Sequence, residues 1–285
     1  MKRLLVGVFI IFLAAVVYNQ RVVLHDYFLG LLNPEVPAVT YEEVQTEIVV
    51  EKEETVEKEI NVDSEIVQED ESEKAAVAEE EQKNPEETIN EPSSSIPTRF
   101  NLAIPFTSQA PYGNWDAVHE ELCEEASILM VYEYYQGLTD AVINKDVAED
   151  QMQRLINFED AFLGVNMSTT AEQTAAVIET YYYLSPEVIL NPTTEDLMTA
   201  LAAGYPVIIP VAGRLLGNPN FTGEGPLYHV LVIKGYTEKG FITNDPGTRN
   251  GADYFYTFDV IMNAIHDWNG GDVLNGQKIM IIVRP

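Results

Sequence analysis

The apolar positions beyond residue 96 follow two spacings, and these predict a series of helices and then a series of strands. Apolar residues at helical spacing, bounded by capping residues and glycine, predict helices over residues 122–136, 144–156, 170–182 and 194–203. Short apolar runs separated by turn residues predict strands over residues 207–211, 228–235, 240–244, 254–258 and 278–283, with a short helix ending at Trp268. Helices followed by strands are typical of an α+β domain with an antiparallel sheet.

A second apolar pattern stands at the amino terminus. Lys2 and Arg3 precede a run, residues 4–18, that is apolar apart from Gly7. Fifteen helical residues span roughly 22 Å, which is short of the ~30 Å hydrocarbon layer, so the run suits a signal peptide as well as a membrane anchor. We predict a signal anchor or signal peptide with its flanking segment over residues 1–32. An anchor is favoured, because no small-x-small cleavage site follows the run and residues 22–32 add further apolar surface.

Between these two regions the chain is strongly acidic. Residues 41–92 hold twenty Asp or Glu and four Lys. Such a segment buries too little apolar surface to offset its chain entropy. We therefore predict an acidic disordered linker over residues 33–96, acting as a spacer from the membrane, and one folded domain over residues 97–285. With the basic end held inside, the domain faces outside the cytoplasm; if the signal is cleaved, the protein is secreted.

Charge and cysteine content exclude several classes of function. The net charge of −30 leaves no basic surface to neutralise phosphates, so no nucleic-acid partner is expected. A single cysteine excludes an internal disulfide, a four-thiolate zinc site and an iron–sulfur cluster. We expect no cofactor and no metal.

The same cysteine is a candidate nucleophile. Cys123 stands at the start of a predicted helix, where the helix dipole and unpaired N–H groups favour a thiolate and can hold an oxyanion. His229 begins an apolar strand, and Asp245 ends the next strand after a short turn, so a hairpin brings the two together. A thiol, an imidazole and an orienting carboxylate are what thiol-dependent acyl transfer requires. Each residue alone has an ordinary structural explanation.

Several blocks of the sequence resemble the papain-like cysteine peptidases of the C39-like group, relatives of the bacteriocin-leader (double-glycine) peptidases. The resemblance covers about residues 103–285 and rests on residues 104–111, Trp115, residues 123–127, residues 228–236 and residues 244–247. It implies a papain-like fold and hydrolysis of a peptide or protein substrate. It also implies that Cys123 is the nucleophile, His229 the base, Asp245 the orienting residue and Gln109 the side-chain donor of the oxyanion hole.

Other functions stay open. One is amidase or transpeptidase work on cell-wall peptides, and another is a catalytically weak surface binding module on the same fold. The run His119-Glu120-Glu121-Leu122-Cys123 resembles a zinc-peptidase helix motif, but ligation would consume the thiol. We interpret His119 as a surface residue on an acidic rim.

Glu124 and Glu125 follow the nucleophile where many members of this family have Gly-Pro. An anion beside the thiol raises its pKa, whereas a protonated His229 lowers it. If water screens both glutamates, the pairing with His229 dominates. We therefore expect the Cys123 pKa to lie below that of a free cysteine.

Overall fold

The computed structural model describes residues 35–50 and 96–285. The first elements after residue 96 are the short strand β1 (Phe100–Asn101), the 3₁₀ turn η1 (His119–Glu121) and the helices α3 (Cys123–Tyr135), α4 (Lys145–Phe162) and α5 (Ala171–Tyr182). Then come β2 (Ser185–Leu190), α6 (Thr194–Ala202), β3 (Val207–Val211) and the 3₁₀ turn η2 (Gly213–Leu216). The chain ends with β4 (His229–Thr237), β5 (Gly240–Asn244), β6 (Tyr254–Thr257), α7 (Phe258–Ala264), the 3₁₀ turn η3 (Val273–Asn275) and β7 (Ile279–Arg284).

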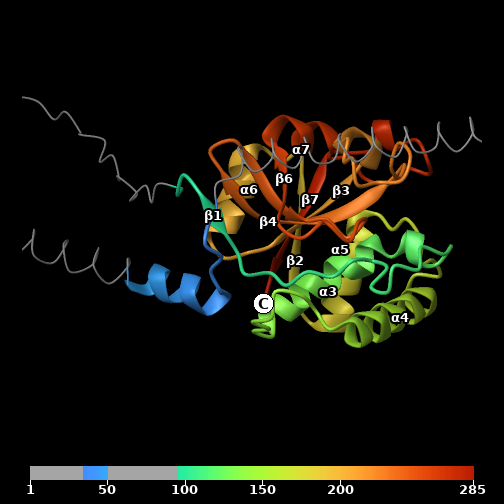
Figure 1. The fold of residues 1–285 in the computed structure, drawn as a ribbon, viewed down its shortest axis with the longest axis horizontal. Coiled ribbons are helices and arrows are strands. Elements are labelled where there is room, and N and C mark those ends of the chain that lie inside the picture. Colours follow the sequence, from blue (N-terminus) through green and yellow to red (C-terminus); the bar gives the residue numbers. More distant parts are fainter. Residues whose placement is uncertain (1–34, 51–95) are drawn as a thin grey trace, which may run out of the picture.

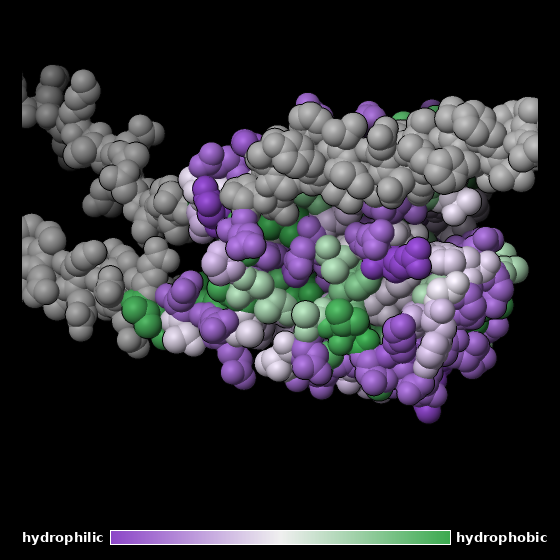
Figure 2. Space-filling view, viewed as in Figure 1, coloured by the Kyte–Doolittle hydropathy of each residue, from purple (hydrophilic) through white to green (hydrophobic). Residues whose placement is uncertain are grey.

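The strands form one antiparallel sheet with the order β2-β7-β3-β4-β5-β6, and β1 pairs with the end of β4. In Figure 1, α3, α4 and α5 lie on one side of this sheet, and α6 and α7 lie on the other. Because both faces are covered, every residue of β3, β4 and β5 is buried. The predicted α+β class with an antiparallel sheet is confirmed. On the face seen in Figure 2, hydrophilic residues cover the end of the molecule around α4, and hydrophobic residues gather towards its middle.

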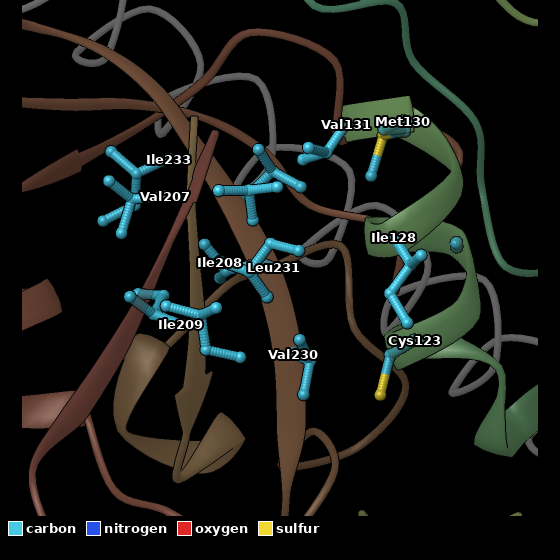
Figure 3. Close-up of a cluster of buried hydrophobic side chains, with 14 of the residues drawn as sticks. Cys123, Ile128, Met130, Val131, Val207, Ile208, Ile209, Val230, Leu231 and Ile233 are labelled. Atoms are coloured by element: carbon cyan, nitrogen blue, oxygen red, sulfur yellow. The ribbon is translucent and has the colours of Figure 1, made fainter. Parts of the chain in front are cut away.

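Helix α3 is the central helix of the fold. Its first nine residues, Cys123 to Val131, are all buried, so it has no solvent-facing side over this length. It lies along β4, and Figure 3 shows Cys123 and Ile128 of α3 facing Val230 and Leu231 of that strand. The Ser127 hydroxyl lies 3.4 Å from the Val230 carbonyl oxygen. This packing places the first residue of α3 beside the first residues of β4.

Three of the four predicted helix starts rest on side-chain caps; the start of α3 has none. The Asn144 side chain accepts hydrogen bonds from two backbone N–H groups of α4, and Thr170 and Thr193 form capping boxes at the starts of α5 and α6. Helix α4 runs six residues past its predicted end at Ile156, because Phe158 packs against the Tyr181 ring of α5. Strand β2 was not predicted: it is an edge strand, partly exposed along its length, that pairs only with β7.

Residues 35–50 form an N-terminal arm that packs on the domain (blue in Figure 1). Val39 exchanges backbone hydrogen bonds with Asn101 and Ala103, and a helix then runs over residues 41–50. Within that helix Val44 is buried and Tyr41 packs edge-on against the Tyr135 ring. The predicted disordered linker over residues 33–96 is therefore wrong for residues 35–50, because four apolar side chains among the acidic ones, Val39, Tyr41, Val44 and Ile48, pack on the core.

The docked N-terminal arm changes what the acidic run over residues 51–95 connects. Residues 51–95 lie outside the described residues, and they join the N-terminal arm to β1, two parts of one domain. They do not separate residues 1–34 from the domain, so the predicted spacer role does not follow from their place in the chain. The predicted signal or anchor over residues 1–32 also lies outside the described residues. Among the helices that the structure describes, none is long and apolar enough to cross a membrane.

We predict that the arm contributes to stability through Val44. This side chain lies over Gly204, where an added Cβ would approach its Cγ1 to 3.1 Å. Val44→Ala should lower the free energy of unfolding by about 1–2 kcal/mol, because it removes buried methyl groups. Val49→Ala, in the same helix but 54% exposed, should change it by less than about 0.5 kcal/mol. Urea denaturation of the two variants measures both; equal effects would show that the arm does not pack in solution.

Candidate active site

His229, the first residue of β4, is buried and rigidly held. The edge of the Phe221 ring meets it at a centroid distance of 5.5 Å and an interplanar angle of 83°. On the Gly247 side, an added Cβ would lie 2.8 Å from His229 Cε1 and 3.0 Å from Nε2. Residue 247 must therefore be glycine for the imidazole to keep this place.

Asp245 fixes the orientation of the His229 ring. Its Oδ1 lies 2.8 Å from His229 Nε2 and accepts a hydrogen bond from the Gly247 N–H. The other oxygen, Oδ2, accepts from the Tyr256 hydroxyl at 2.7 Å and from the Asn218 amide at 3.2 Å. Burial by itself would raise the pKa of Asp245, but His229 and the other donors outweigh it, and the pKa is lowered. Asp245 is thus an anion, and His229 Nδ1 is left without a hydrogen bond to the described residues.

The hairpin explains why these two residues meet. Strand β5 pairs with β4 so that Asn244 lies opposite Val232, with a bulge between Ile233 and Gly235. Asp245 therefore leaves β5 beside the start of β4. The contact that we predicted between His229 and Asp245 is confirmed; Asn218 and Tyr256, which support it, were not predicted. Asn218 lies in the loop before β4.

Cys123, the first residue of α3, does not bond to His229. Its Sγ donates to Glu124 Oε2 at 2.9 Å. The Val230 N–H faces the sulfur and lowers the pKa of Cys123, but burial, and then Glu124, raise it more strongly, so the pKa is well above its ordinary value. Our expectation of a lowered pKa is wrong. The pairing with His229 on which it rested is replaced by a hydrogen bond to Glu124, and the glutamates are not screened by water.

Glu124 is buried between α3 and the start of α5. Its Oε1 accepts a hydrogen bond from the Thr169 N–H at 3.0 Å, and the Thr169 carbonyl accepts one from the Tyr228 hydroxyl at 2.7 Å. Burial raises the pKa of Glu124, although the thiol and the Thr169 N–H work against that rise. A chain of contacts thus runs from Cys123 through Glu124 and Thr169 to Tyr228, the neighbour of His229.

Gln109 is buried beside the turn that carries Asp245. Its backbone N–H donates to the Pro246 carbonyl at 3.0 Å, and its side-chain Nε2 donates to the His119 carbonyl at 2.8 Å. The other side-chain atom, Oε1, is buried and has no partner among the described residues. The second N–H of the side-chain amide makes no hydrogen bond to the described residues.

One family model and one solved structure identify proteins to which the chain is similar. The model of the peptidase C39-like family matches residues 101–270. The chain belongs to this family. Among solved structures, a Bacillus anthracis protein provisionally named a C39-like peptidase matches with 18% identity and a TM-score of 0.43, covering 66% of this chain and 98% of its own. No curated protein matches the sequence significantly.

In this C39-like chain, His119 is neither a zinc ligand together with Cys123 nor a surface residue, the two roles that we considered for it. It is buried, contrary to our interpretation of it as a surface residue, and its ring nitrogens face Asp116 and Glu149. It therefore does not act with Cys123 as a ligand pair. Among residues 35–50 and 96–285, no group of three or more His, Cys, Asp or Glu side chains could hold a metal ion.

Glu125 and Glu159, on α3 and α4, form a buried pair of carboxyl groups. No N–H or O–H of the described residues reaches any of their four oxygens. Burial and the neighbouring carboxyl groups raise the pKa of Glu125 well above its ordinary value and that of Glu159 to about 8. The two carboxyl groups can form a hydrogen bond to each other only if one of them is protonated. The sequence hint was the run of apolar residues after Glu125, which leaves α3 no exposed side.

We predict that this pair makes the domain more stable in mild acid. A carboxyl with a folded pKa above its unfolded value stabilises the fold at low pH, and that stability falls as pH rises from about 4.5 towards 8. The slope is at most about 1.4 kcal/mol per pH unit for one proton. Glu125→Gln should flatten the decline, since an amide can donate to ionised Glu159. Urea denaturation between pH 5 and 8 measures it. Exposed Glu120→Gln should keep the wild-type slope; a wild-type slope in Glu125→Gln would refute the shared proton.

We also predict that Glu124 raises the Cys123 pKa more than Glu125 does. Glu124→Gln removes the anion in contact with the thiol, so it should lower the Cys123 pKa clearly; Glu125→Gln, the matched control one residue further on, should lower it less. The pH dependence of iodoacetamide alkylation gives the pKa of the single thiol in each protein. A larger effect of Glu125→Gln would mean that the hydrogen bond from Cys123 to Glu124 is not made in solution.

Proposed function

We propose that the protein is a cysteine peptidase that hydrolyses peptide or related amide bonds with Cys123, His229, Asp245 and Gln109. The observation that carries this proposal is the buried contact between His229 and ionised Asp245, which stands directly beside the Val230 N–H that faces the Cys123 sulfur. Asp245 occupies Nε2, so Nδ1 is the nitrogen free to take the thiol proton. Membership of the C39-like family supports the same chemistry.

The reaction follows from these positions. The thiol gives up its hydrogen bond to Glu124 and transfers its proton to His229 Nδ1. The sulfur then attacks the carbonyl carbon of the scissile amide. Negative charge then develops on the carbonyl oxygen, where the Gln109 side chain and the uncapped N–H groups at the start of α3 can donate. His229 returns the proton to the leaving amine, which departs and leaves a thioester. A water, deprotonated by His229, hydrolyses the thioester and regenerates the thiol.

One observation favours a second candidate, a catalytically weak binding module on the same fold. In the resting structure the thiol bonds to Glu124 instead of His229, and its pKa is raised. When a peptidase binds substrate, its thiol must leave Glu124 for His229 and its pKa must fall. A binding module needs neither change. Amidase work on cell-wall peptides uses the same residues and differs in the amide that is hydrolysed. Transpeptidase work also uses these residues, but an amine accepts the acyl group in place of water.

Digestion of a peptide library by the purified full chain, read by mass spectrometry, tests the proposal. We expect cleavage that Cys123→Ala abolishes and that His229→Ala lowers by about a thousandfold or more in kcat/KM, because the groups act as one unit. His266→Ala is the matched control and should keep activity, because the His266 ring bonds to the Gly276 carbonyl and not to Cys123, His229 or Asp245.

The outcomes separate the candidates. Turnover retained by Cys123→Ala would exclude thiol catalysis. A folded wild-type protein that binds peptides without cleaving any would favour the binding module. Added amines that divert the acyl group into new amides would indicate transpeptidase work.

A further inference from the structure

His119 lies in η1, on the segment between Gln109 and Cys123, and both of its ring nitrogens face carboxylates. Nδ1 lies 2.7 Å from Asp116 Oδ1 on the same segment, and Nε2 lies 2.9 Å from Glu149 Oε1 on α4. The Asn114 amide is also near the ring, 3.2 Å from Nδ1. The His119 side chain is only 9% exposed.

Two carboxylate acceptors require two donors. A neutral imidazole has one N–H, so its other nitrogen would turn a lone pair towards a carboxylate. Only the doubly protonated ring satisfies both contacts. Burial opposes the charged form, but Asp116 and Glu149 outweigh it and raise the pKa of His119, and the pKa of Asp116 falls to about 2. In this doubly protonated form, His119 joins its segment to α4 through two ion pairs.

The backbone of His119 acts on a different group. Its carbonyl accepts the 2.8 Å hydrogen bond from Gln109 Nε2, while the Gln109 N–H donates to the Pro246 carbonyl. The side-chain amide of Gln109 is therefore held between the His119 segment and the turn that carries Asp245. If the His119 segment moves, the Gln109 amide loses the bond that sets its orientation.

We propose that His119, paired with Asp116 and Glu149, is a positioning residue that holds the Gln109 side chain for oxyanion stabilisation; this rests on the proposed peptidase function. Because a raised folded pKa gives stability that is lost as pH rises through it, the pairing weakens on the alkaline side. The proposed consequence is an alkaline decline in kcat that depends on Glu149, a residue remote from the thiol.

Glu149→Gln tests this, because it removes one of the two charges and keeps the shape of the side chain. We expect kcat for peptide cleavage to fall about tenfold, with a smaller change in KM. This loss is smaller than that caused by removing an oxyanion donor outright, because Gln109 is still present but is less well held. The alkaline limb of the kcat profile should move to lower pH. Iodoacetamide alkylation of Cys123 forms no oxyanion, so its rate should stay within about twofold. Asp150→Asn, next to Glu149 but exposed and paired with Arg154, should leave kcat, the pH profile and alkylation unchanged.

Two results would overturn the proposal. One is an unchanged kcat and pH profile in Glu149→Gln. The other is a parallel loss of alkylation and cleavage, which would indicate general damage to the site. The His119 pKa, followed by NMR and assigned with His119→Gln, should lie above the ordinary value and fall in Glu149→Gln; an ordinary value would refute the ion pairs themselves. A wild type that cleaves no peptide, with a raised His119 pKa, would instead overturn the proposed function.

Discussion

The contact between His229 and Asp245 is the interaction on which the rest of the site depends. A buried carboxylate keeps its charge only if donors surround it, and Asp245 receives hydrogen bonds from four groups: the His229 ring, the Gly247 N–H, the Tyr256 hydroxyl and the Asn218 amide. His229 belongs to β4, Gly247 to the turn that follows β5, Tyr256 to β6, and Asn218 to the loop that precedes β4. Much of the carboxyl-terminal half of the domain is thus arranged around one anion.

The acidic groups on the helical side have pKa values that are shifted in the opposite direction. Glu125 and Glu159 are as deeply buried as Asp245, yet no donor from the described residues reaches them, and their pKa values are raised. Glu124 is intermediate, with the Thr169 N–H and the Cys123 thiol as donors. The number of donors, more than the depth of burial, decides the direction in which the pKa of each carboxyl group is shifted. In a chain of net charge −30, the carboxyl behind the histidine has a lowered pKa and the carboxyls near the thiol have raised ones.

The amino-terminal part of the domain contributes by holding segments in place. Strand β1 and the N-terminal arm hold the chain that leads to Gln109, since Val39 bonds to Asn101 and Ala103 on either side of Leu102. The next segment is tied to the Asp245 turn through Ser108 and Gln109, which both contact the Pro246 carbonyl. Residues from both ends of the domain therefore meet at a single turn, and a fold lacking residues 35–50 would lose part of that support.

The sequence by itself determined the helices α3 to α6, the strands β3 to β7 and the pairing of His229 with Asp245, but not the edge strand β2. These features depend on local patterns: helical and strand periodicity, caps at Asn144, Thr170 and Thr193, and a short hairpin. Its resemblance to the C39-like peptidases also pointed to the family. Only the tertiary structure decided the charge states and the supporting contacts. Glu124, Glu159 and His119 look like surface residues in sequence, since charged side chains normally remain in water. Their burial follows from the packing of α3 and α4, and their partners lie as many as 45 residues away. A pKa depends on such neighbours in space, and no local pattern specifies them.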